Sequence, residues 1–218
     1  MSRSAQTRPI DPARLDALDR AIAADEVLRG EWTDGHGRAC ALAHLAPETG
    51  ERRTSEACPA TVMPQWLAAL TPEIDDHTSL AARPAILRRY AAVARRWHAL
   101  DAPTWRRLDF ETRALSVRVA RPHATAAEWR AIDAVLALLD QEAAGKRVPA
   151  AAWDAASAAA WDAAGASAWD AARAAAWDAA RDAAGAAARA AASAAARAAI
   201  STGLLSAIER ECTRAEAA

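Results

Sequence analysis

The chain has 218 residues and a formal net charge of −1, with 27 basic and 28 acidic side chains. This balance argues against a globally cationic nucleic-acid binder and against an acidic mimic of nucleic acid. The length is typical of one or two domains, and the hydrophobic fraction of 53% is inflated by alanine.

The first third of the chain predicts short helices separated by loops. Asp11 before Pro12 is a typical helix start, and an apolar stripe continues from there to Gly30. The next segments are a glycine-rich loop at Glu31–Arg38, a helix at Ala39–Leu45, a turn-rich stretch at Ala46–Cys58, a helix at Pro59–Leu70 and a linker at Thr71–Ser79.

A strongly amphipathic helix is expected to begin at Arg83-Pro84, with an apolar stripe that includes Tyr90. Its opposite face is basic and is the best candidate for a surface that binds phosphates or an acidic partner. The alternative is a solvated face balanced by acidic neighbours such as Asp101, Asp109 and Glu111. The arginines of this surface are Arg83, Arg88, Arg89, Arg95, Arg96, Arg106, Arg107 and Arg113.

Two further helices follow in the middle of the chain. The first is capped at Asp101 and ends at Arg121-Pro122. The second is capped by Thr125, is expected to bury Trp129, and ends before Gly145.

From Pro149 to Ala199 the chain is mostly alanine, the residue with the highest helix propensity. The other residues recur mainly every four positions, which is about 400° around a helix and suits no standard coiled coil. We expect one long helix, with Gly185 as the favoured point for a break and an interruption at Thr202-Gly203. Its aspartates and arginines exclude a transmembrane helix.

The tryptophans of this tract have two interpretations. They could fill the core while the alanines allow close helix packing, in which case Trp161 and Trp169 should be buried and their replacement by alanine should destabilise the fold. Alternatively, part of the tract is exposed and binds a partner through a ladder of indole and guanidinium groups. The ladder consists of Trp169, Arg173, Trp177 and Arg181.

These elements predict an all-α, multi-helix bundle of about seven or eight helices with a long Ala/Trp-rich C-terminal helix. We expect an N-terminal helical domain at residues 1–148. Residues 149–218 would form a helical segment packed on that domain or projecting from it.

The sequence contains no motif of a known catalytic or metal site. His36 in a glycine-rich loop, and His77 after Asp75-Asp76, could contribute to a metal site, but turns are the favoured interpretation. Cys58 precedes a proline near a helix start, where thiol pKa values fall, yet no partner for a nucleophile can be identified. We therefore expect no enzyme, no catalytic or metal-binding residue and no cofactor.

The three cysteines, Cys40, Cys58 and Cys212, are odd in number and form no CxxC pair. A reduced, cytoplasmic environment is therefore expected. The first residues contain no apolar stretch typical of a signal peptide.

Several segments between Cys58 and Arg121, together with the Ala-Trp tract, resemble uncharacterised all-helical proteins of phages and prophages. The segments are Cys58–Ala68, Leu70-Thr71, Asp75-Asp76, Arg88–Ala91, Arg96-Trp97 and Leu100-Asp101. The resemblance implies a phage or mobile-element origin and a location in the cytoplasm of a bacterial host. It assigns no functional residues.

Our first hypothesis is therefore a non-enzymatic, phage-encoded helical protein that binds a host or phage protein complex, such as an anti-CRISPR-like inhibitor of host defence. Alternatives are a self-assembling structural protein, and a nucleotide or small-molecule binder that uses tryptophan and arginine side chains. Nucleic acid could bind through the arginine patch, and no membrane is expected. The candidate partner-binding residues are Arg88, Arg89, Arg95, Arg96, Arg106, Trp169, Arg173, Trp177 and Arg181.

Overall fold

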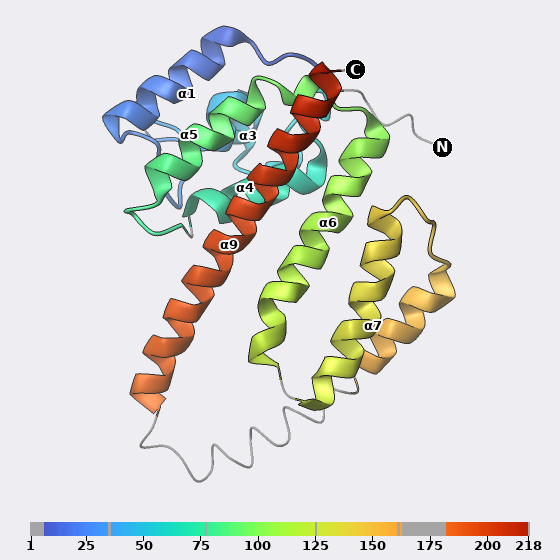
Figure 1. The fold of residues 1–218 in the computed structure, drawn as a ribbon. Helices are drawn as coiled ribbons and strands as arrows, with labels where there is room; N and C mark the ends of the chain where they lie inside the picture. The colour runs from blue at the N-terminus through green and yellow to red at the C-terminus, as the bar shows by residue number, and fades with distance from the viewer. Residues whose placement is uncertain are drawn as a thin grey trace. The chain divides into compact units, whose positions relative to one another are not determined.

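The computed structural model describes residues 7–34, 36–76, 78–124, 126–160, 162 and 182–217. These residues are mainly helical and contain no strand, apart from an isolated bridge between Thr33 and Ala39. The all-α architecture with a long C-terminal helix is confirmed. Figure 1 shows that helix, α9, running unbroken from its orange start to its red end.

The helices are short in the first part of the chain and longer afterwards. They are α1 (Pro12–Ala24), α2 (Ala41–Leu45), α3 (Pro47–Arg52), α4 (Gln65–Asp76), α5 (Arg83–Ala94), α6 (Ala102–Ala120), α7 (Ala126–Ala143), a helical segment at 150–160, and α9 (Asp182–Glu216). Short 3₁₀ turns occur at Ser55–Ala57, Trp97–Ala99 and Arg121–His123.

The chain divides into two compact units. The first contains Met1–Leu108 and Ser201–Ala218, and the second contains Asp109–Ile200. The composition suggested a boundary between residues 148 and 149, which is not where these units divide. The last turns of α9 belong to the first unit because their apolar side chains, including Leu204 and Ile208, are buried there.

The core of the first unit is built around aromatic side chains. Tyr90 and Trp97 meet edge to face with ring centroids 5.7 Å apart, and Trp105 meets Trp97 in the same manner at 6.3 Å. Tyr90 and Trp97 are fully buried, as the apolar stripe predicted. The Tyr90 hydroxyl is paired with the Thr71 hydroxyl at 2.7 Å, so its polar end is satisfied in the core.

The second unit contains the later turns of α6, α7 and the segment at 150–160. Phe110 stacks on Trp153 with ring centroids 6.4 Å apart, and Leu139 of α7 is buried. Trp129 was expected inside this unit, but 43% of it is exposed. The expectation that Trp129 is buried was therefore wrong.

The end of α1 differs from the sequence prediction. The helix starts as expected, with the Asp11 carboxylate accepting a hydrogen bond from the Ala13 amide at 2.9 Å. It ends at Ala24 instead of Gly30, because Asp25 adopts a left-handed conformation with φ of 57° and closes the helix with its own backbone amide.

Two segments expected to lack a helix contain one. The turn-rich stretch at Ala46–Cys58 contains α3, which begins at Pro47, the position where proline is tolerated. The linker expected from Thr71 is part of α4, which passes through Pro72 and continues to Asp76. The helix persists because residues beyond the proline, including Ile74, are buried in the first unit.

The helix α9 is continuous through Gly185, the favoured point for a break in an otherwise long helix, and through Thr202-Gly203, where an interruption was expected. One glycine costs a helix about 1 kcal/mol, which burial of Leu204 and Leu205 immediately afterwards can offset. The predicted burial of Trp161 and Trp169 is not tested, because both residues lie outside the described residues.

Candidate functional site

The arginines of α5 are the first candidates, and the structure pairs most of them with carboxylates. Arg95, in the turn that follows α5, donates from Nη2 to Asp16 at 3.2 Å and to Asp19 at 2.7 Å. Both aspartates lie on α1, one turn apart on the same helix face. Arg95 therefore ties the end of α5 to α1.

Three other arginines of the first unit pair with glutamates near the end of α9. Arg89 binds Glu209 through two hydrogen bonds of 3.1 and 2.8 Å, and Arg96 binds Glu216 through two of 2.6 and 2.7 Å. Arg107 donates to Glu211 at 2.6 Å. We call these three ion pairs the α9 arginine clasp. They lie beside the buried apolar face of α9.

The clasp pairs several of the positive charges of the basic surface with carboxylates. Its hydrogen bonds raise the pKa of Arg89 and of Arg96, and Arg96 in turn lowers the pKa of Glu216. The charges are thus neutralised in pairs, mostly by acids from distant helices that sequence spacing could not identify. A phosphate or an acidic partner would have to compete with these pairs.

The remaining predicted partner-binding residues fall into three groups. Arg88 is exposed on α5, and no ion pair is found for it among the described residues. Arg106 is exposed and takes part in interactions within the protein. Outside the described residues lie Trp169, Arg173, Trp177 and Arg181. Partner binding by any of these residues stays a prediction.

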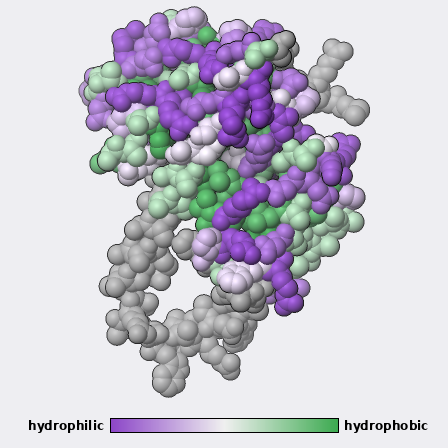
Figure 2. Space-filling model, viewed as in Figure 1, coloured by the Kyte–Doolittle hydropathy of each residue, from purple (hydrophilic) through white to green (hydrophobic). Residues whose placement is uncertain are grey.

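Figure 2 shows that hydrophilic side chains cover much of the visible surface over α1 and α5, with small apolar areas between them. This appearance agrees with the alternating arginines and carboxylates of this surface. It is the pattern of a solvated helix face balanced by acids, which was the alternative interpretation of the basic stripe.

Arg83 does not belong to the exposed basic surface, which corrects the sequence prediction. It is only 6% exposed, and its Nε donates to the Asp75 carboxylate at 2.8 Å. Its Nη2 donates to the carbonyl oxygens of Val27 and Leu28, each at 2.9 Å. A buried guanidinium with this many partners is an internal anchor.

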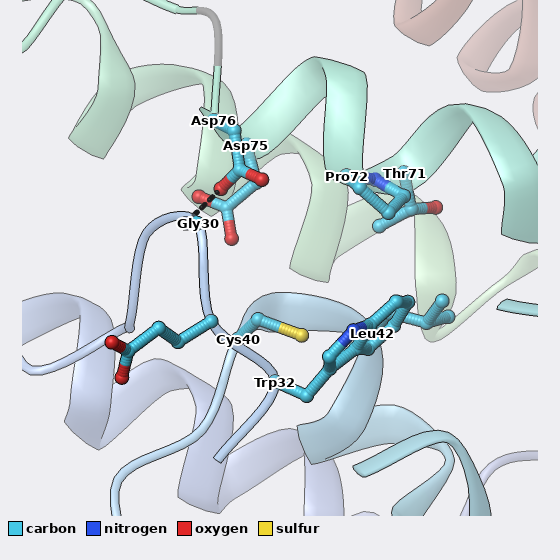
Figure 3. A pocket seen from close by; sticks show the side chains of 9 residues that line it. Gly30, Trp32, Cys40, Leu42, Thr71, Pro72, Asp75 and Asp76 are labelled. Atoms are coloured by element: carbon cyan, nitrogen blue, oxygen red, sulfur yellow. Dashed lines mark hydrogen bonds between the residues drawn. The ribbon is translucent and has the colours of Figure 1, made fainter. Parts of the chain in front are cut away.

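A small cavity of about 80 Å³ lies beside this ion pair (Figure 3). The carboxylates of Asp75 and Asp76 lie on one side of it, and Cys40 and Trp32 lie on the other. Asp76 accepts a hydrogen bond from the Gly30 amide at 2.7 Å, and Asp75 accepts one from the Ala41 amide at 3.3 Å. The two carboxylates therefore bind the loop between α1 and α2 at Gly30 and the first residue of α2, Ala41.

Asp75 and Cys40, which line this cavity, are both buried. Burial raises the pKa of Asp75, although Arg83 opposes that effect, and burial raises the pKa of the Cys40 thiol. Asp75-Asp76 was expected to form an acidic turn, but the pair ends α4. We therefore assign Asp75 and Asp76 a positioning role for the loop.

The loop itself is organised by Asp34. Its carboxylate accepts hydrogen bonds from the backbone amides of His36 and Arg38, both at 2.9 Å, and from Arg38 Nε at 2.7 Å. The Arg38 hydrogen bond is the main reason that the pKa of Asp34 falls to about 2. Gly37 has φ of 82°, which a residue with a side chain rarely adopts.

The other chemical candidates are held in the interior or lie outside the described residues. Cys58 is buried, and burial raises its pKa to about 12, which corrects the low value expected near a helix start. Burial also raises the pKa of Cys212, to about 11. His77 lies outside the described residues, and within the described ones no three His, Cys, Asp or Glu side chains form a group that could hold a metal ion.

Trp129 on α7 is a candidate that the sequence analysis misplaced. The guanidinium carbon of Arg121 lies 5.4 Å from the centre of its indole. Asp133 accepts from Arg121 Nε at 2.8 Å and from Nη2 at 3.0 Å. The signal that could have revealed the exposure is Asp133 itself, four residues after Trp129 on the same helix face.

No protein-family model, curated protein or solved structure matches this chain. The resemblance to phage and prophage proteins therefore stays a prediction. No helix among the described residues is long and apolar enough to cross a membrane.

Proposed function

We propose that this chain is a non-enzymatic helical protein that binds another protein, and that Trp129 is the centre of the contact surface. The observation that carries the proposal is the 43% exposure of this indole on α7. Tryptophan and arginine are enriched among the residues that dominate the energy of protein interfaces. Here one of each stands together on the surface of the second unit.

The Arg121 guanidinium already contacts the Trp129 indole in the protein without a partner. Two hydrogen bonds from Arg121 to Asp133 fix the guanidinium over the indole. A contact surface whose side chains already occupy one conformation loses less entropy on binding. This arrangement of side chains favours a specific protein contact over the incidental exposure of one apolar residue.

The same geometry specifies the chemistry of the partner. The indole requires an apolar pocket on the partner surface. Arg121 uses Nε and Nη2 for Asp133, so an acceptor beside that pocket, such as a carboxylate or a backbone carbonyl, would pair with Nη1. We therefore propose a protein surface with an apolar pocket bordered by a hydrogen-bond acceptor.

Two observations support a binding role over the alternatives. The thiols of Cys40, Cys58 and Cys212 are buried and have raised pKa values, which disfavours a cysteine nucleophile. Nucleic acid at the basic surface would compete with the carboxylates that pair with Arg89, Arg96 and Arg107 in the α9 arginine clasp. Self-assembly would engage the same Trp129 and is separated from partner binding by measuring the mass of the free protein.

The narrower identity, a phage protein that inhibits a host defence complex, is part of this proposal and rests on the resemblance alone. A protein complex of the bacterial host would be the partner. The experiment below therefore uses bacterial lysate.

The proposal is tested by affinity enrichment from bacterial lysate with quantitative mass spectrometry. The wild-type chain is compared with Trp129→Ala and with Leu80→Ala, which removes the other large apolar side chain exposed among the described residues. Circular dichroism verifies that each variant is folded. We expect proteins enriched by the wild type and by Leu80→Ala, and lost with Trp129→Ala; equal enrichment by all three would contradict the proposal.

A further inference from the structure

A second and larger cavity opens on the first unit, between α1, the loop after it and α2. Its volume is about 350 Å³, within the range of about 300–1,000 Å³ typical of small-molecule sites. The polar side chains that line it are Arg20, Glu26, His36, Arg38 and His44. Neither the basic-surface prediction nor the Trp129 surface uses this cavity.

Two guanidinium groups supply its positive charge. Arg20 is exposed on α1, and Arg38 lies in the loop after that helix. The hydrogen bond from Arg38 Nε to Asp34, at 2.7 Å, fixes the direction of this side chain and engages only one of its nitrogens. Arginine pairs with the oxygens of phosphate in a two-point geometry, and two guanidinium groups that line one cavity can contact the same phosphate.

His44, which also lines the cavity, carries a polar atom without a hydrogen-bond partner in the described part of the chain. Its Nε2 is buried and has no hydrogen-bond partner among the described residues. Burial lowers the pKa of His44, so the ring is neutral near pH 7. A buried ring nitrogen without a partner is costly, and a modest turn of the ring toward a bound hydroxyl or phosphate oxygen would remove that cost.

Glu26 introduces a selectivity that a pure anion site would lack. Its carboxylate lines the same cavity as the two arginines. An ionised carboxylate accepts hydrogen bonds only, and it repels a free anion. A ligand that offers hydroxyl groups toward Glu26 and an anionic group toward the arginines satisfies both.

We propose that this cavity binds a small phosphorylated sugar or polyol, with the phosphate between Arg20 and Arg38 and the hydroxyl groups toward Glu26 and His44. The volume of about 350 Å³ leaves room for a carbon skeleton beside the phosphate. This site lies on the first unit and Trp129 on the second, so either proposal can fail while the other stands.

The test follows the ring resonances of His36 and His44 by NMR in the full-length protein. Ribose 5-phosphate, inorganic phosphate and ribose are titrated separately at constant pH and ionic strength. We expect saturable shifts at both rings with ribose 5-phosphate, and about tenfold weaker binding of inorganic phosphate or ribose. Equal affinity for inorganic phosphate would overturn the sugar assignment, and absence of any shift would overturn the site.

Two variants make the test specific. Arg20→Ala removes an exposed arginine of the cavity and should weaken ribose 5-phosphate binding about tenfold. Arg52→Ala removes an exposed arginine of α3 outside the cavity and should leave the affinity unchanged. Equal loss in both variants would mean non-specific attraction by surface charge and would overturn the proposal.

Discussion

Arg89 and Glu209 stand 120 residues apart in the sequence and form a two-point ion pair between α5 and α9. Arg89 also donates to the Ser206 hydroxyl at 2.9 Å, one turn earlier on α9. Each side chain of the ion pair is about one third exposed. The pair therefore lies at the edge of the interface, beside the buried Leu205 and Ile208.

Replacing Arg89 by alanine should lower the free energy of unfolding by about 1 kcal/mol, since partly exposed pairs rarely contribute more. Arg88→Ala is the matched control, because Arg88 is the exposed neighbour of Arg89 in the sequence. This change should alter the free energy of unfolding by less than about 0.5 kcal/mol. Denaturant unfolding measures both. Equal effects would mean that the clasp does not stabilise α9.

Removing Asp75 should be far more damaging, because it leaves the buried Arg83 without its carboxylate. We expect Asp75→Ala to cost about 3–5 kcal/mol, and a second change, Arg83→Met, to restore part of that loss. Asp109→Ala, which breaks an exposed pair with Arg113, should cost less than about 1 kcal/mol. Thermal and denaturant unfolding measure these free energies of unfolding. A loss of stability in Asp75→Ala no larger than that in Asp109→Ala would contradict the role of Arg83 as an internal anchor.

The thiol of Cys58 should resist alkylation in the folded protein. Its pKa of about 12 leaves almost no thiolate at pH 8, and the side chain is buried. Mass spectrometry after brief treatment with iodoacetamide should find Cys58 unmodified in the native protein and modified in denaturant. Rapid native labelling would show that the helix start lowers the pKa after all.

The loop carboxylate Asp34 should titrate well below an ordinary aspartate. Its pKa is about 2, against the ordinary value of 3.8, chiefly because of the Arg38 hydrogen bond. Since the pKa is lower in the folded state, ionised Asp34 stabilises the loop above about pH 4, and this contribution is lost as the pH falls toward 2. Carboxyl NMR should give a midpoint near 2, which Arg38→Ala should raise; a wild-type midpoint near 4 would contradict the loop geometry.

The parts of the fold that follow local rules could be predicted from the sequence. Asp11-Pro12 specified the start of α1, and the apolar spacing around Tyr90 specified the buried face of α5. Prediction failed where contacts with distant parts of the chain determine the extent of a helix. Helix α4 passes Pro72 and α9 passes Gly203 because burial elsewhere in the first unit offsets the local cost.

The candidate sites were harder to foresee for the same reason. The arginines of α5 were identified, but their carboxylates lie on α1 and α9 and are brought close only by packing. Arg83 carries the same charge as Arg88, and only the proximity of Asp75 makes it an internal residue. The cavity of Arg20, Arg38 and His44 joins three separate segments, and no local spacing relates them.

The most direct test of the proposed function is the affinity of the purified partner for the wild type and for Trp129→Ala, measured by calorimetry. A central tryptophan typically contributes 2 kcal/mol or more to an interface, so we expect Trp129→Ala to weaken binding by at least about thirtyfold. Leu80→Ala should bind like the wild type. Unchanged affinity in the folded Trp129→Ala variant would contradict the assignment of α7 as the contact surface.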